Sequence, residues 1–230
     1  MTTVFLIRHG LTAQTGTSLY GRTGGILLDH RGVAQAERLA ARFEGVKLTA
    51  IYSSPLERCV GTVEPLAAAQ RLRVDPRQEL IEMDAGTWTG KPLRRLRHLK
   101  AWQEVQSSPS TFRFPDGESY VEARDRVVAE VERIARRHRQ GRVVVATHGD
   151  IVRVLLNHYS GAPLDAFQRM AADTASVSVV AIGGGRAAVL LMNDTVGGLR
   201  RFGPGQIDAP WEEAVEASTV PGPKKKNLRG

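Results

Sequence analysis

Two histidines in this 230-residue chain each follow a short apolar run and precede a glycine. His9 stands in an Arg-His-Gly triplet after residues 4–7, and His148 stands in a His-Gly pair after residues 143–146. Apolar runs without alternation are typical of strands that are buried on both faces of a parallel sheet. Because open α/β sheets bind ligands at the carboxyl ends of their strands, we expect both imidazoles at one edge of the sheet.

Two arginines are expected at the same edge. Arg8 directly precedes His9, and Arg58 follows a third apolar strand at residues 50–52. Pro55 suits the first turn of a helix, and that turn would contain Arg58. Guanidinium groups and the free backbone amides of helix starts both bind anions. These residues therefore predict a site for a phosphate-like anion.

A histidine in such an anion site suits phosphoryl transfer. A neutral imidazole is a good nucleophile near pH 7 when its other ring nitrogen donates its proton to a backbone carbonyl. The arginines and the second histidine would stabilise the charge that develops on the phosphoryl oxygens. No histidine pair stands at metal-ligand spacing beside a cysteine or carboxylate cluster, so we expect neither a metal nor another cofactor.

The departing alkoxide needs a proton, which a carboxyl group held partly away from water would supply. Glu82 follows two apolar residues and precedes a glycine-punctuated loop that carries Trp88. The local sequence therefore favours Glu82 as the acid. Asp84 stands two positions later and remains the competitor.

The segments that must position these residues alternate between helix and strand. This order predicts an α/β fold of three α/β/α layers around a mostly parallel central sheet. Helices are expected after Gly32 and from about Glu118, the second with Glu130 on its outward face. Residues 176–182 and 187–192 read as a hairpin around three glycines.

One domain over residues 1–202 suits the length of the chain and its 42% of hydrophobic residues. From residue 203 the composition shifts to proline, glycine and charge, so residues 203–230 are predicted to be a tail. We expect no signal peptide and no membrane span. The one cysteine, Cys59, fits a reducing compartment, which predicts a cytoplasmic protein in which this thiol packs in the core.

Taken together, these segments resemble the histidine phosphatase superfamily, the phosphoglycerate-mutase-like proteins. The resemblance rests on four motifs in the family order: LIRHGLT at residues 6–12, SSPLERC at residues 53–59, an E-x-D-x-G-x-W-x-G loop at residues 82–90, and THGD at residues 147–150. A P-x-G-E-S segment at residues 115–119 is also shared. Within this superfamily, the chain also resembles a bacterial branch labelled as phosphomutases. The resemblance implies a phosphoglycerate-mutase-like fold with a short cap within residues 83–117.

Carried over residue by residue, the resemblance implies a role for each of five side chains. His9 would be the phosphorylated nucleophile and Glu82 the proton donor. The phosphate pocket would be formed by Arg8, Arg58 and His148. The implied reaction passes through a phosphohistidine without a metal.

Four further residues are implied to contact the substrate: Thr12, Thr15, Gly21 and Gly149. Many relatives have an asparagine at the position of Thr15, so the sequence departs from the family pattern there. The departure predicts that this contact is weaker or is made by a hydroxyl.

The spacing between Glu82 and His148 favours hydrolysis over transfer. The cofactor-dependent mutases that the chain resembles have a long insertion between these two positions, whereas only 65 residues lie between them here. A short cap would leave the phosphohistidine open to water. We therefore expect a phosphatase that acts on a small acidic metabolite, with a phosphoglycerate-type phosphomutase as the alternative.

The chain is basic, with a formal net charge of +8 and a sequence pI of about 10.1. A non-catalytic phosphate- or nucleic-acid-binding module is the alternative from another class. No recognition motif supports it, so the expected partner is a small phosphorylated metabolite, with no nucleic acid and no membrane; a homodimer stays open. Four basic residues of the cap region either recognise a second acidic group of the substrate or form a solvated helix face: Arg94, Arg95, Arg97 and Lys100.

Overall fold

A six-stranded sheet forms the centre of the computed structural model, which describes residues 1–202. The strands in spatial order are β3 (Val74–Pro76), β2 (Ala50–Ser53), β4 (Arg142–Thr147), β1 (Thr2–Arg8), β5 (Val177–Gly183) and β6 (Arg186–Asp194). The first four run parallel, β5 is antiparallel to β1, and β6 is antiparallel to β5. This strand arrangement confirms the mostly parallel sheet predicted from the sequence. The predicted tail at residues 203–230 lies outside the described residues.

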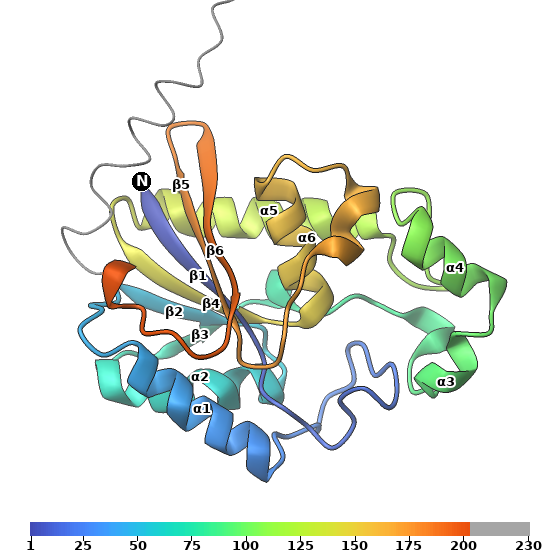
Figure 1. The fold of residues 1–230 in the computed structure, drawn as a ribbon, viewed down its shortest axis with the longest axis horizontal. Coiled ribbons are helices and arrows are strands. Elements are labelled where there is room, and N and C mark those ends of the chain that lie inside the picture. Colours follow the sequence, from blue (N-terminus) through green and yellow to red (C-terminus); the bar gives the residue numbers. More distant parts are fainter. Residues whose placement is uncertain (203–230) are drawn as a thin grey trace, which may run out of the picture.

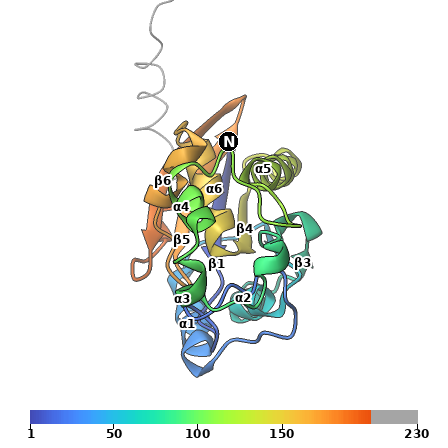
Figure 2. The same ribbon diagram turned by 90° about the vertical axis from the view of Figure 1, so that its right-hand side faces the viewer.

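Residues 1–202 also contain six α-helices: α1 (His30–Arg42), α2 (Glu57–Gln70), α3 (Leu93–Leu96), α4 (Lys100–Ser107), α5 (Tyr120–Arg137) and α6 (Gly149–Tyr159). Short 3-10 helices are found at Gln78–Leu80, Gly86–Trp88, Leu164–Arg169 and Arg200–Phe202. Helices α1 and α2 cover one face of the sheet, and α5 and α6 cover the other (Figures 1 and 2). The three-layer α/β/α class predicted from the sequence is therefore confirmed. No helix within residues 1–202 has the length and apolarity needed to cross a membrane.

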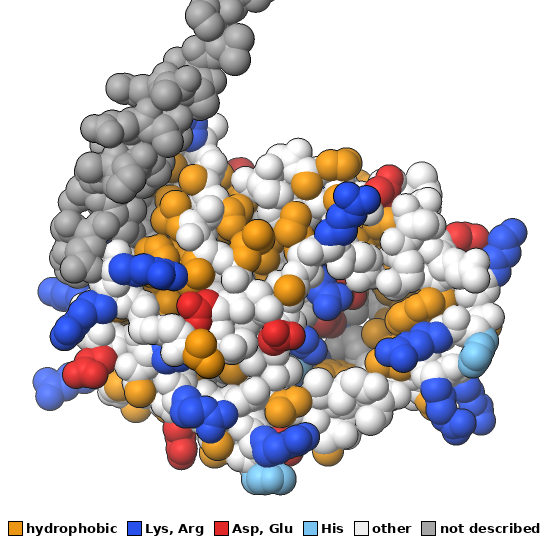
Figure 3. Space-filling view, in the orientation of Figure 1, with side chains coloured by type: hydrophobic (Ala, Val, Ile, Leu, Met, Phe, Trp, Pro, Cys, Tyr) orange, Lys and Arg blue, Asp and Glu red, His pale blue; other side chains and the backbone are white. Residues whose placement is uncertain are grey.

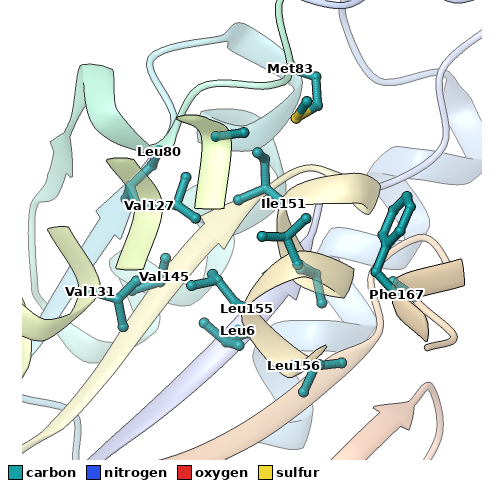
Figure 4. Close-up of a cluster of buried hydrophobic side chains, with 14 of the residues drawn as sticks. Leu6, Leu80, Met83, Val127, Val131, Val145, Ile151, Leu155, Leu156 and Phe167 are labelled. Carbon is teal, nitrogen blue, oxygen red and sulfur yellow. The ribbon is translucent and has the colours of Figure 1, made fainter. Parts of the chain in front are cut away.

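The apolar run of β1 is buried on both sides because its residues alternate between two cores. Leu6 packs toward α5 and α6 in a cluster that includes Val127 and Leu155 (Figure 4). Phe5 packs in a second cluster with Phe43, on the face that α1 and α2 cover. A strand between two helical layers has no polar face, which explains why the sequence shows no alternation.

The prediction for Glu130 was wrong. This residue lies three positions after Val127 and four before Ile134, both of which are buried, and so it shares their face of α5. The residue is only 4% exposed, and its carboxylate accepts hydrogen bonds from Arg133 Nε (2.8 Å) and Nη2 (2.7 Å). The ion pair with Arg133 compensates for the burial of the charge, which a hydrophobicity pattern cannot anticipate.

Two predicted helix starts were also displaced. Helix α1 begins at His30, so Gly32 lies inside its first turn, where its N–H donates to Asp29 Oδ1 (2.8 Å) as an N-cap hydrogen bond. Helix α2 begins at Glu57, so Pro55 lies before the helix while Arg58 lies in the first turn as predicted. The glycine hairpin between β5 and β6 is confirmed, because Gly184 and Gly185 both have positive φ angles.

Candidate active site

The parallel register of β1 and β4 brings the two motif histidines together. Arg8 pairs with Thr147 at the ends of these strands, so the residues that follow, His9 and His148, are neighbours. Their ring centroids are 5.4 Å apart, with an interplanar angle of 64°. The predicted meeting of both imidazoles at one sheet edge is therefore present in the structure.

His9 is held in the tautomer that nucleophilic attack requires. Its Nδ1 lies 2.8 Å from the carbonyl oxygen of Gly10. Since a carbonyl oxygen only accepts, Nδ1 carries the proton and Nε2 keeps its lone pair. Burial lowers the pKa of His9 to about 3, and the positive charges of Arg8 and Arg58 also lower it. The imidazole is therefore neutral at pH 7.

The two arginines lie at different depths. Arg8 lines the pocket and donates through Nη1 to the carbonyl oxygen of Ala172 (2.6 Å). Arg58 is fully buried, and it donates through Nη2 to the carbonyl oxygen of Gly21 (2.8 Å). Its guanidinium also lies 4.8 Å from the ring centroid of Tyr20. The charge of Arg58 thus sits behind the part of the wall that Gly21 and Tyr20 form.

His148 is also fully buried, behind the pocket surface. Its Nε2 lies 2.8 Å from Ser54 Oγ and 3.4 Å from Cys59 Sγ. Burial, followed by the proximity of His9 and of the arginines, holds the pKa of His148 well below its ordinary value. Burial raises the pKa of the Cys59 thiol, in agreement with its predicted core position.

The carboxyl group of Glu82 lines the pocket and has a raised pKa. Its Oε1 accepts a hydrogen bond from Met83 N (2.9 Å). Burial raises the pKa of Glu82 to about 7, and the negative charge of Asp150 adds to the effect. Near neutral pH the group can therefore donate a proton or accept one.

Asp84, the competitor for this role, points elsewhere. Its side chain is 43% exposed, and Oδ2 lies 3.5 Å from Arg22 Nη1. Its Oδ1 accepts a hydrogen bond from Gly86 N (3.0 Å), so the carboxylate closes the loop that follows Glu82. The structure therefore places only Glu82 of these two carboxyl groups in the pocket wall.

The pocket has a volume of about 330 Å³. Figure 3 shows it as a hollow to the right of centre, with basic and acidic side chains inside. Of the residues predicted from the sequence, five line it: Arg8, His9, Gly21, Glu82 and Gly149. Apolar residues from the α3–α4 segment, including Trp102 and Val105, form another part of the wall.

The structure does not place Thr12 and Thr15 in the pocket wall. Their hydroxyl oxygens lie 3.0 Å apart, and Thr15 Oγ1 also accepts from Thr12 N (3.0 Å). Thr12 is buried. The two hydroxyls thus satisfy each other within their own turn, because the short threonine at position 15 reaches back to the backbone at position 12.

Sequence reasoning missed the two charged pocket residues on α6, Asp150 and Arg153. Helical spacing could have found Arg153, since it stands four residues after Gly149 and therefore on the same face. The four basic residues of the cap region, by contrast, are exposed and do not line the pocket: Arg94, Arg95, Arg97 and Lys100. They form the solvated helix face. Within residues 1–202 no cluster of three His, Cys, Asp or Glu residues could hold a metal ion.

Similarity to known proteins agrees with this geometry. Phosphoserine phosphatase 1 of Hydrogenobacter thermophilus is 32% identical over 200 residues, covering 85% of this chain and 93% of that protein. Phosphoglycerate mutase-like protein 4 of Arabidopsis thaliana is 29% identical over 157 residues, covering 66% of this chain and 68% of that protein. The solved structure of Bacillus stearothermophilus YhfR matches with a TM-score of 0.78 at 27% identity, covering 84% of this chain and 98% of that one.

The family comparison covers nearly all of the described chain. A family model for the histidine phosphatase superfamily (branch 1) matches residues 4–195. That span includes both histidine-bearing strand ends and the Glu82 loop. The chain therefore belongs to the histidine phosphatase superfamily.

Proposed function

We propose that this protein is a metal-independent phosphatase that hydrolyses small acidic phosphomonoesters through a phosphohistidine at His9. One observation carries the proposal: a buried, neutral imidazole lines the pocket with its Nδ1 proton fixed by Gly10. Such a ring presents Nε2 as a nucleophile without an adjacent base. Membership of the histidine phosphatase superfamily supports the same chemistry.

In the first step, Nε2 of His9 attacks the phosphorus atom and the bond between phosphorus and the ester oxygen breaks. The protonated carboxyl of Glu82 gives its proton to the departing oxygen. Arg8 at the wall, with Arg58 and His148 behind it, stabilises the charge on the three remaining phosphoryl oxygens. The products are a free alcohol and phosphohistidine.

In the second step, a water molecule attacks the phosphohistidine. The Glu82 carboxylate accepts a proton from this water, and the bond between phosphorus and Nε2 breaks. Inorganic phosphate leaves and His9 returns to its neutral form. The pKa of Glu82, raised to about 7, suits both the donation and the acceptance.

The pocket suits a small substrate that is covered by a short cap. A volume of about 330 Å³ lies at the lower end of the range for ligand pockets. We assign the cap to residues 83–117, because α3 and α4 within that range supply Leu93, Trp102 and Val105 to the wall. A cap of this length favours water over a second substrate hydroxyl as the phosphoryl acceptor.

The protein has a free, buried thiol at Cys59, which suits a reducing compartment, and we therefore assign the protein to the cytoplasm.

The test is hydrolysis of 4-nitrophenyl phosphate by the full chain, together with trapping of an acid-labile phosphoryl group during turnover. His9→Ala is expected to lose at least about 10³-fold in kcat and all of the label. His30→Ala is the matched control, because His30 is an exposed histidine at the start of α1 and should retain both. Retained turnover in His9→Ala would overturn the proposal. A screen of phosphorylated metabolites with and without a bisphosphate primer separates hydrolysis from mutase activity.

A further inference from the structure

Arg153 lies in the pocket one helical turn beyond the phosphate-binding end. Gly149 opens α6 directly beside Arg8, since a methyl group at Gly149 would lie 3.1 Å from Arg8 Nε. Arg153 follows Gly149 by four residues, so it projects from the same face of α6 about 6 Å further along the helix axis. Both arginines line the same pocket.

The guanidinium of Arg153 has few partners within residues 1–202. Its Nη1 lies 3.4 Å from Gln168 Oε1 and 3.5 Å from Asp150 Oδ1, and both distances are long. Its Nε is buried without a hydrogen-bond partner among these residues. An arginine has five N–H donors, so most of the donor capacity of Arg153 is unused.

Arg126 shows what a structural arginine looks like in the same fold. It donates from Nε and Nη2 to the two oxygens of Glu118, at 2.9 Å each. Its Nη1 donates to the carbonyl oxygens of Glu79 (2.6 Å) and Ile81 (3.0 Å). Arg153 makes no comparable set of contacts within residues 1–202, although it is similarly shielded, with 29% of its side chain exposed.

Resting on the proposed function, we propose that Arg153 is a specificity-determining residue that binds a carboxylate of the substrate. The planar guanidinium fork matches a carboxylate in a bidentate arrangement. Asp150 in the same wall would repel a second, doubly charged phosphate more strongly than a singly charged carboxylate. The preferred substrates are therefore small phosphomonoesters that carry a carboxylate about one helical turn from the phosphorus atom.

The competing explanation is that Arg153 only neutralises Asp150. In that case its loss would alter the charge at the Glu82 end of the pocket and change the rate on alkyl substrates with and without a carboxylate by the same factor, because Asp150 raises the pKa of Glu82. A carboxylate-binding role instead makes the loss depend on whether the substrate has a carboxylate. The two explanations thus differ in the ratio of rates on matched substrates.

The experiment compares kcat/KM for two matched pairs, O-phosphoserine with phosphoethanolamine, and 3-phosphoglycerate with glycerol 3-phosphate. 4-Nitrophenyl phosphate serves as a reference that lacks the carboxylate. The wild type is expected to prefer the carboxylated member of each pair by about 10- to 100-fold, the range of a charge-assisted hydrogen bond. Arg153→Gln should abolish the preference mainly through KM, and Arg153→Lys should keep part of it. Arg97→Gln, on the exposed part of the cap, is the matched control.

The outcomes separate this inference from the proposed function. Hydrolysis of 4-nitrophenyl phosphate without a wild-type preference for carboxylated substrates would overturn the role of Arg153 and leave the phosphatase intact. Equal losses on both members of each pair in Arg153→Gln would overturn it as well. No hydrolysis of any substrate by the wild type would overturn both. The wild-type preference needs no variant, so misfolding of Arg153→Gln does not prevent the test.

Discussion

Glu82 Oε2 lies 3.9 Å from His148 Nδ1 at the base of the pocket. This distance is too long for a hydrogen bond. The imidazole is also neutral near pH 7, because burial holds the pKa of His148 well below its ordinary value. An ion pair with His148 therefore does not draw the proton away from Glu82, and the negative charge of Asp150 helps to retain it. Glu82 is consequently still partly protonated near pH 7, in a pocket that otherwise favours anions.

Glu82→Gln is expected to slow alkyl phosphomonoesters far more than activated aryl phosphates. An alkoxide requires a proton as it leaves, whereas a nitrophenolate does not, so the loss of kcat/KM should be about 10²- to 10⁴-fold on alkyl substrates alone. The measurement is kcat/KM over a series of leaving groups, because kcat/KM covers the departure of the leaving group but not the later attack of water, which is common to all substrates. Asp84→Asn is the control, because this exposed carboxylate binds Gly86 N outside the pocket wall. Equal losses on both substrate classes would assign Glu82 a structural role.

The rate on alkyl substrates should fall as the pH rises through about 7. The active form of Glu82 is protonated, and its pKa is raised to about 7. His9 should not limit the rate on the acid side until about pH 3, to which burial lowers its pKa. Asp150→Asn removes a charge that raises the pKa of Glu82, so the alkaline limb should move to lower pH. Profiles of kcat/KM against pH provide the measurement, and a limb that stays in place would contradict the role of Asp150.

Glu82→Gln should also stabilise the protein above neutral pH. A carboxyl group whose folded pKa rises from 4.5 to about 7 contributes stability below pH 4.5 that is lost as the pH rises through 7. Glutamine does not ionise, so the variant should gain about 1–3 kcal/mol in the free energy of unfolding at pH 8. Urea denaturation at pH 5 and pH 8 tests this. A gain of the same size at both pH values would show that ionisation is not the cause.

Gly86→Ala should destabilise the loop that follows Glu82. Gly86 has a positive φ of 49°, and a methyl group there would overlap the carbonyl oxygen of Pro115 and lie 2.8 Å from Gly117 N. The expected cost is about 1–3 kcal/mol in the free energy of unfolding. Gly90→Ala is the matched control, since Gly90 also has a positive φ but has open space around it. It should carry only the backbone strain, about 1 kcal/mol. Equal costs at both sites would exclude the overlap as the cause.

The sequence by itself determined the fold class and the edge at which the site lies. The apolar runs before His9 and His148 have no alternation, which is typical of strands covered on both faces. Parallel strands then place the residues that follow them at the same edge, whatever the helices between them do in detail. Both inferences depend on local patterns, which is why they hold in the structure.

Only the tertiary structure decided which polar groups reach the pocket. Glu82 and Asp84 are two positions apart, but only Glu82 lines the pocket. The folded loop brings Arg22 and Gly86 N to Asp84, and these contacts hold its carboxylate outside the pocket wall. Arg58 and His148 lie behind the wall rather than in it, because carbonyl and hydroxyl partners from other segments hold them there. Hydrogen-bond partners that are distant in sequence set the direction of a side chain and its pKa, and no local pattern records them.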